Sequence, residues 1–104
     1  MKLGDKIRSL RRGKKLTLDE LALAAGMSKS YLWELENRET PNPSAEKLDN
    51  LAKVLSMPVS YFLESDADEP EERHLDEAFF RDYNSLDAPA KEQLRKIVEA
   101  FKKS

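Results

Sequence analysis

The chain of 104 residues contains no cysteine, one histidine and three glycines, and these scarcities exclude several classes of protein. Without cysteine there is neither a disulfide framework nor a thiolate metal site, which is typical of a reducing compartment. His74 alone cannot supply a zinc site of the usual kind, and three glycines leave no glycine-rich phosphate loop. We therefore expect a protein that is not an enzyme, with no catalytic residues, no metal ion and no cofactor.

Long apolar runs are also absent. No stretch approaches the roughly 20 apolar residues that cross a bilayer, and residues 1–15 lack the apolar segment of a secretory signal. We expect a cytoplasmic protein without membrane contact. The charged fraction of 37% beside 39% hydrophobic residues suits a small helical domain with an appendage.

The net charge of −2 is unevenly distributed, because residues 1–63 carry +3 and residues 64–104 carry −5. Seven of the first fifteen residues are Lys or Arg, and only one is acidic. DNA binding depends on such local clusters rather than on net charge. The cluster is either a phosphate-binding patch, with Arg11 and Arg12 as its main candidates, or a solvated helix face.

Two short helices joined by a turn are predicted between Leu16 and Asn37. Thr17 and Glu20 have the spacing of a capping box at the start of the first helix. Gly26 can adopt the left-handed backbone that a sharp turn needs. Ser28 then caps a second helix, whose Leu32 and Leu35 point inward. This is the outline of a helix-turn-helix, in which the start of the second helix reads base edges in the major groove.

Apolar stripes predict three further helices around this motif. Leu3, Ile7 and Leu10 would face inward from the first, in residues 4–11. The helix after the motif begins at Ser44 and contributes Leu48, Leu51, Ala52 and Leu55. Pro58 ends that helix, and Val59, Phe62 and Leu63 of a short last helix are expected to close the core.

This ordered set of five elements resembles the lambda-repressor/Cro-like family of helix-turn-helix regulators, also called the XRE family. The stretch from Gly26 to Leu32 is especially similar to SinR-type repressors of that family. The resemblance implies an all-α fold, with a five-helix DNA-binding domain over residues 1–64. It also implies that the partner is double-stranded DNA.

The resemblance places Lys29, Ser30 and Glu34 at base-facing positions. Lys29 can donate to guanine O6 or N7, and Ser30 can donate or accept. Glu34 can accept from cytosine N4 or hold Lys29 in place. Ser28 is first an N-cap, and it can also contact a phosphate at the helix N-terminus.

Two aromatic residues of the same helix have open roles. Tyr31 either contacts a thymine methyl or the DNA backbone, or packs against the preceding helix. Trp33 stands where the family usually has a small polar residue. It lies one turn after Lys29, so it is expected to face outward. There it either packs against the following loop or contacts sugars and thymine methyls.

Phosphate contacts are expected on both sides of this helix. Many relatives have a Gln that binds a phosphate at the position of Leu18. A leucine side chain cannot bind a phosphate, so Thr17 and the neighbouring helix amides are expected to take over this contact. The loop after the second helix is polar and is either a backbone contact or a plain surface loop. Its candidates are Asn37, Arg38, Thr40 and Asn42, with Lys47 as a weaker one.

The composition changes after residue 63. Residues 64–72 hold six acids and Pro70, so we expect residues 65–73 to form an acidic, solvated linker. Residues 74–104 then read as a helical hairpin, with a stripe of Leu75, Phe79, Tyr83 and Leu86. The second helix is capped by Asp87 and tolerates Pro89 in its first turn.

Such a hairpin cannot bury its own aromatic residues. Its apolar face therefore either mediates dimerisation or docks on the first domain. The residues expected at a dimer interface are Phe79, Tyr83, Leu94, Ile97, Val98 and Phe101. In layout the hairpin resembles that of SinR-type proteins, which implies self-association and binding of a protein antagonist.

These observations favour a dimeric, sequence-specific transcriptional repressor acting on a palindromic operator. One alternative is an antitoxin that binds a toxin and represses its own operon. Another is a protein-interaction module that has kept the fold and lost DNA binding, which Trp33 and Glu34 on the reading face would allow.

Overall fold

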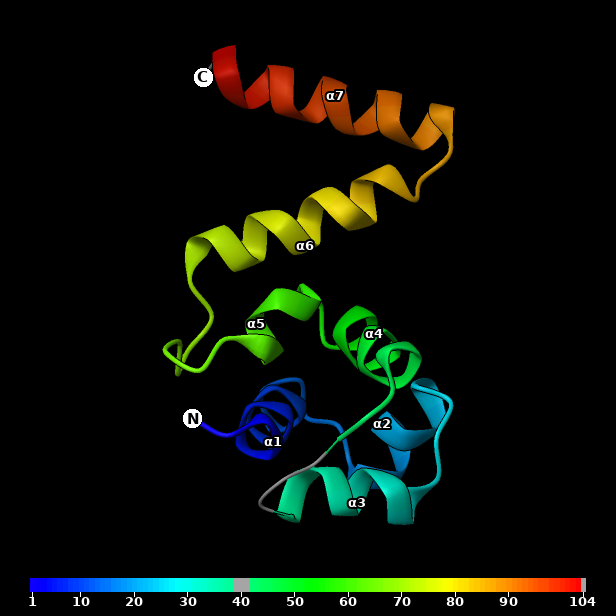
Figure 1. Ribbon diagram of the computed structural model, residues 1–104. Coiled ribbons are helices and arrows are strands. Elements are labelled where there is room, and N and C mark those ends of the chain that lie inside the picture. The colour runs from blue at the N-terminus through cyan, green and yellow to red at the C-terminus, as the bar shows by residue number, and fades with distance from the viewer. Residues whose placement is uncertain (39–41, 104) are drawn as a thin grey trace.

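The computed structural model describes residues 1–38 and 42–103, and the regular structure of these residues is entirely helical (Figure 1). The chain order confirms the predicted all-α class, five helices followed by a hairpin. The helices are α1 (Leu3–Gly13), α2 (Leu18–Ala24), α3 (Lys29–Asn37), α4 (Ala45–Val54), α5 (Val59–Leu63), α6 (Glu72–Asn84) and α7 (Ala88–Lys103). None of the described helices is long and apolar enough to cross a membrane.

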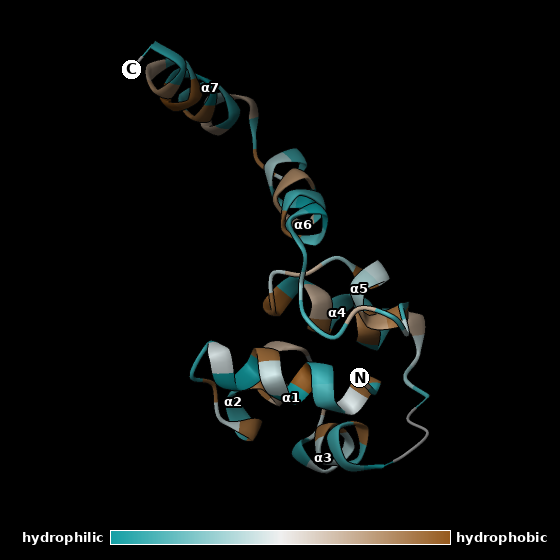
Figure 2. Ribbon diagram, turned by 90° about the vertical axis from the view of Figure 1, so that its left-hand side faces the viewer, coloured by the Kyte–Doolittle hydropathy of each residue, from teal (hydrophilic) through white to brown (hydrophobic). Residues whose placement is uncertain are grey.

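The first five helices surround one hydrophobic core. Its centre is formed by side chains with no measurable exposure, including Ile7, Leu21, Leu32 and Leu51, one from each of the first four helices. Figure 2 shows α6 and α7 extending away from this five-helix body. The amphipathic periods predicted for the first four helices are thus confirmed, because each helix turns its apolar stripe toward the same interior.

Side-chain caps begin the helices where the sequence predicted them. Thr17 accepts a hydrogen bond from the Glu20 amide at 3.1 Å, and the Glu20 carboxylate accepts one from the Thr17 amide at 2.8 Å. Ser28 and Ser44 cap α3 and α4 by accepting from the amides of Tyr31 and Lys47, and Asp87 accepts from the amide of Ala90 in the first turn of α7. These caps satisfy amides that have no partner within their helices.

Three helices end in the same left-handed turn. The second residue after the helix has a positive φ, and the amide of the residue that follows it returns to a carbonyl five residues earlier, as in a Schellman motif. Gly26 (φ 70°) was expected there, whereas Lys15 (φ 59°) and Ser56 (φ 57°) are not glycines and were not. The apolar residue that follows each of them packs on the core: Leu16, Met27 and Met57. Such an apolar contact commonly accompanies this turn, and it offsets part of the cost of a positive φ at Lys15 and Ser56.

Tyr61, and not Leu63, closes the bottom of the core. Leu63 is 70% exposed, so its predicted core role is wrong, while Tyr61 is 1% exposed. Burial of the tyrosine is possible because its hydroxyl donates to the carbonyl of Asp68 at 3.1 Å.

Lys6 is buried beneath this tyrosine, although the sequence placed it in the basic cluster. Its ammonium donates to the carbonyl of Tyr61 at 2.6 Å and to that of Glu64, and it lies 4.4 Å from the centre of the Tyr61 ring. Burial lowers the pKa of Lys6, against the opposing effect of Glu64 and the nearby aspartates. Lys6 therefore joins α1 to α5 and contributes nothing to a surface patch.

The acidic segment after α5 is mostly exposed, but it contacts the first domain at two points. Ala67 is 4% exposed and belongs to the core, and the carbonyl of Asp68 holds the Tyr61 hydroxyl. Most of the other side chains in residues 65–73 are exposed, so the expected acidic linker stays a prediction, with these two contacts added to it. Repulsion among the acids is offset by Lys6, which the composition of the segment alone could not show.

α6 docks on the first domain through a face that the apolar stripe did not predict. His74 and Ala78 are buried, and Nη1 of Arg81 donates to the carbonyl of Met57 at 2.7 Å. The Glu64 carboxylate accepts two hydrogen bonds from Arg73, at 2.7 and 2.9 Å, and lies 3.1 Å from Nε2 of His74. These polar contacts set the direction in which α6 leaves the domain.

The predicted apolar stripe of the hairpin consequently stays exposed. Phe79 and Phe80 are 60% and 64% exposed, and α7 has no buried residue. α6 thus docks on the chain's own domain through its other face, and the apolar stripe stays uncovered, so dimerisation through that stripe remains a prediction.

The pKa of Glu64 predicts how this docking responds to acid. Hydrogen bonds from Arg73, with a smaller contribution from His74, lower that pKa from 4.5 to about 2. Because the folded-state pKa lies below the unfolded one, the stabilisation is complete above pH 4.5 and is lost as pH falls toward 2. We expect Glu64→Gln to be less stable than the parent at pH 7 and to lose less stability over this window. Urea denaturation between pH 2 and 7 measures both, and parallel profiles would contradict the assignment.

Candidate nucleic-acid interface

The turn between α2 and α3 is held in place by α4. Nδ2 of Asn50 donates to the carbonyl of Ala25 at 3.2 Å, and Nζ of Lys47 donates to that of Gly26 at 2.6 Å. Lys47, a weaker candidate for phosphate contact, thus braces the turn. The angle between α2 and α3 is therefore set by their contacts with α4 as well as by the turn itself.

The outer face of α3 carries the side chains that the resemblance placed against bases. Lys29, Ser30 and Glu34 are exposed. Lys29 forms an ion pair with Asp19 of α2 at 3.4 Å, and Glu34 pairs with Arg38 at 3.4 Å. The idea that Glu34 holds Lys29 is not supported, because each has a different partner. Such exposed pairs are weak and can exchange for a ligand.

The remaining α3 candidates divide between packing and exposure. Tyr31 is half-buried and packs against the core, as its packing interpretation expected. Trp33 is 53% exposed and faces outward as predicted. Asn37 donates to the carbonyl of Trp33 at 2.8 Å and accepts from Nη2 of Arg8 at 2.7 Å, and its side chain remains exposed.

The inner face of α3 contains a buried carboxylate, which the sequence analysis missed. The side chain of Glu36 is 1% exposed, and its oxygens accept from Nε and Nη2 of Arg11 at 2.8 and 3.0 Å. Arg8 lies 3.4 Å from the same carboxylate and donates to the Glu36 carbonyl at 3.0 Å. The signal was available, since Glu36 follows Leu32 by four residues and so falls on the buried side of the helix.

This ion pair changes the role expected of Arg11. Its third donor group binds the carbonyl of Leu16 at 3.1 Å, and the hydrogen bond to Glu36 raises its pKa. Three of the five N–H groups of this guanidinium are thus engaged within the protein, and the side chain is 13% exposed. Arg11 thus fixes α3 against α1, and the phosphate contact expected of it stays a prediction.

Gly4 makes the close approach of α1 and α3 possible. A Cβ atom at this position would lie 2.6 Å from the carbonyl oxygens of both Leu35 and Glu36. Any larger residue would push the helices apart, and the arginines of α1 would then no longer reach Glu36 with the same geometry.

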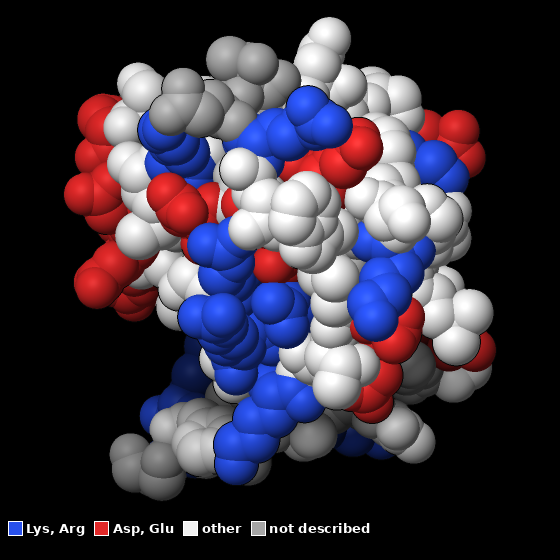
Figure 3. Space-filling model, turned by 90° about the horizontal axis from the view of Figure 1, so that it is seen from below, with Lys and Arg blue, Asp and Glu red and all other residues white. Residues whose placement is uncertain are grey.

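Basic side chains gather on the face of the molecule that includes α3, with most acidic ones toward its edges (Figure 3). From the predicted patch, Arg12, Lys14 and Lys15 are exposed at the end of α1, whereas Lys6 and Arg11 are withdrawn from it.

Of the other residues predicted to contact phosphates, Thr17, Arg38 and Asn42 are exposed, and Thr40 lies outside the described residues. Within the described chain, no group of His, Asp and Glu side chains is arranged to hold a metal ion.

A family model described as a helix-turn-helix domain matches residues 2–60. The chain belongs to this family. It is an XRE-like helix-turn-helix protein, as the resemblance predicted.

Individual relatives agree with this assignment. The chain is 37% identical over 62 residues to the transcriptional regulator SinR of Bacillus subtilis, covering 60% of this chain and 56% of SinR. It is 33% identical over 103 residues to the immunity repressor of Bacillus phage phi105, covering 95% of this chain and 66% of that protein. The chain thus spans a little over half of the SinR relative.

Two solved structures of SinR resemble the fold. The crystal structure of SinR in complex with DNA superposes with a TM-score of 0.57 at 37% identity, covering 60% of this chain and 98% of that one. The SinR–SinI complex superposes with a TM-score of 0.60 at 26% identity and covers 98% of this chain and 99% of that one. The second likeness includes the C-terminal hairpin.

The buried ion pair predicts a large effect of one substitution. Glu36→Ala leaves the Arg11 guanidinium mostly buried without its counter-charge, and we expect a loss of about 3–5 kcal/mol in the free energy of unfolding. Glu34→Ala, on the exposed face of the same helix, is the matched control and should change stability by about 0.5 kcal/mol or less. Urea denaturation measures both variants, and equal effects would show that the pair does not hold α3.

Proposed function

We propose that this protein binds double-stranded DNA in a sequence-specific manner through α3 and represses transcription. The main support for the proposal is that α3 has a tightly packed inner face and an exposed polar outer face. Its inner face is fixed by Leu32, Leu35 and Glu36, and its outer face presents Lys29 and Ser30 near the helix N-terminus. A rigid helix with exposed donors on a basic face is suited to reading base edges in the major groove.

The proposed contacts follow from exposure. Lys29 and Ser30 read bases, and Glu34 accepts from a cytosine amino group after releasing Arg38. Contacts to the phosphates come from positions around α3 and set the register without reading sequence. They are Arg12, Thr17, Ser28, Asn37, Arg38 and Asn42, with Thr40 beside them in the chain.

The relatives support this proposal. SinR has been crystallised with DNA, and the phi105 relative is an immunity repressor. Because α1 to α5 match the SinR structure, the same presentation of α3 is available here. A repressor of this kind acts by occupying a promoter site that the polymerase needs.

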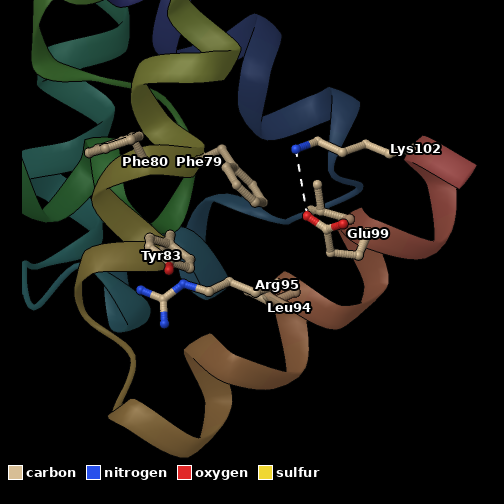
Figure 4. Close-up of a pocket in the computed structure, with 8 residues that line it drawn as sticks. Phe79, Phe80, Tyr83, Leu94, Arg95, Glu99 and Lys102 are labelled. Atoms are coloured by element: carbon tan, nitrogen blue, oxygen red, sulfur yellow. Dashed lines mark ion pairs between the residues drawn. The ribbon is translucent and has the colours of Figure 1, made fainter.

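We further propose that the hairpin forms a homodimer. In Figure 4, Phe79, Phe80 and Tyr83 of α6 and Leu94 of α7 line a cleft of about 340 Å³ between the two helices. Within the hairpin the two helices leave this cleft open, since α7 buries none of its residues. Ile97, Val98 and Phe101 extend the apolar surface along α7 and are 52%, 50% and 75% exposed. A second copy would cover this surface and place two α3 helices on a palindromic operator.

The same surface also suits a protein antagonist. SinR forms a complex with SinI, and that structure matches this chain through the hairpin. An antagonist that covered the apolar face of α6 and α7 would compete with the second copy and thereby weaken binding to a two-part operator.

Selection from a random duplex library with the full chain tests the proposal. We expect enrichment of an inverted repeat whose half-sites are one helical turn, or a multiple of it, apart. Absence of any enriched sequence, with the protein folded by circular dichroism, would reject sequence-specific binding and favour a protein-interaction module.

The hairpin can be tested in the same selection. Val98→Glu places a charge in the cleft and should yield single half-sites, with a monomer by sedimentation. Ala100→Glu, on α7 outside the cleft lining, is the matched control and should keep the inverted repeat. A dimeric Val98→Glu protein would remove the hairpin from the dimer interface.

Lys29 and Arg12 are expected to contribute differently. Lys29→Ala should weaken binding to the selected site by about 1–3 kcal/mol and affect random DNA less, because a base contact is lost. Arg12→Ala should weaken binding to the selected site and to random DNA equally, and it should reduce the number of ions released on binding by about one. Affinities measured at several salt concentrations separate the two cases. Equal losses for Lys29→Ala on both duplexes would make it a phosphate contact.

A further inference from the structure

A hollow of about 240 Å³ lies on the outer face of α3, beside the start of α2. Leu18 of α2 and Trp33 of α3 are its apolar members. Lys29, Ser30 and Glu34 complete it with an ammonium, a hydroxyl and a carboxylate. The hollow therefore combines an apolar wall with hydrogen-bonding groups, on the face proposed to meet DNA.

Trp33 is the unusual member of this group. Its side chain is 53% exposed and is not among the residues packed on the core, whereas Leu18 packs on the core. An aromatic side chain left this exposed forgoes the hydrophobic stabilisation that burial provides. Within the described chain nothing covers the hollow, so an external apolar group seated between Leu18 and Trp33 would be stabilised there.

The polar groups around the hollow indicate which apolar group this is. Lys29 precedes Trp33 by one helical turn, and its ion pair with Asp19, at 3.4 Å, keeps the ammonium at the side of α3 that faces α2. In the major groove a thymine presents a C5 methyl group next to its O4 acceptor, and no other unmodified base carries a methyl. A methyl seated between Leu18 and Trp33 would bring a base acceptor within reach of Lys29.

We infer that this hollow receives the C5 methyl group of one thymine in each half-site. Leu18 and Trp33 contact the methyl, and Lys29 donates to O4 of that thymine or to the neighbouring base. The inference rests on the proposed function, because it requires α3 to lie in the major groove. It adds a second kind of recognition, apolar contact, to the hydrogen bonds proposed above.

Removal of a single methyl group tests the inference. In the duplex selected with the full chain, each thymine of one half-site is replaced in turn by deoxyuridine, which lacks only the C5 methyl. We expect one replacement to weaken binding about fourfold, which corresponds to burial of one methyl group. The other replacements should leave the affinity nearly unchanged.

Variants then connect this thymine to the hollow. Trp33→Ala and Leu18→Ala should bring the thymine-to-uracil affinity ratio at that position close to one. Leu23→Ala is the matched control, because Leu23 is 84% exposed on α2 and lies outside the hollow, and it should keep the ratio. The ratio compares two duplexes with the same protein, so a general loss of affinity cancels, and thermal melting verifies that each variant is folded.

Three results would overturn the inference. In the first, no thymine of the half-site is sensitive to replacement by deoxyuridine. In the second, the sensitivity persists unchanged in both Trp33→Ala and Leu18→Ala. The third is a selection without any enriched duplex, which rejects the proposed function itself. A site that is enriched and yet indifferent to deoxyuridine rejects only the methyl contact, so the two failures are distinguishable.

Discussion

The buried carboxylate of Glu36 is the contact on which the presentation of α3 depends. It is enclosed by Arg11 and Arg8 of α1, and the close approach of Gly4 allows α1 to reach it. A buried charge with two partners holds one geometry, because any displacement leaves a charge unpaired in a poorly solvated place. The outer face of α3 therefore has a defined position before any ligand arrives, and binding requires little ordering of the helix.

A second polar cluster connects this domain to its hairpin. Lys6 and Tyr61 close the core below α1, and Glu64 continues to Arg73 and His74 at the start of α6. Because α6 uses this polar side for docking, its aromatic side faces away from the domain. The direction of the hairpin and the exposure of its apolar cleft thus have the same cause, and both are required for the proposed dimer.

Local features of the fold were predictable from sequence. The caps at Thr17, Ser28 and Asp87 and the turn at Gly26 each involve residues within one turn of one another, so the residue types suffice to identify them. The amphipathic stripes similarly predicted five helices and a hairpin. The left-handed turns at Lys15 and Ser56 were not predictable, since they depend on how Leu16 and Met57 pack on a core formed by distant segments.

The sequence by itself determined which segments are helical, where most of them begin, and that Lys29, Ser30 and Trp33 share the outer face of one helix. Only the tertiary structure decided which charges remain at the surface. Arg11 and Lys6 read as members of one basic cluster, yet one binds a carboxylate 25 residues away and the other a carbonyl 55 residues away. Desolvation makes such partners obligatory, and a partner that distant in the chain is set by the packing of helices rather than by local composition.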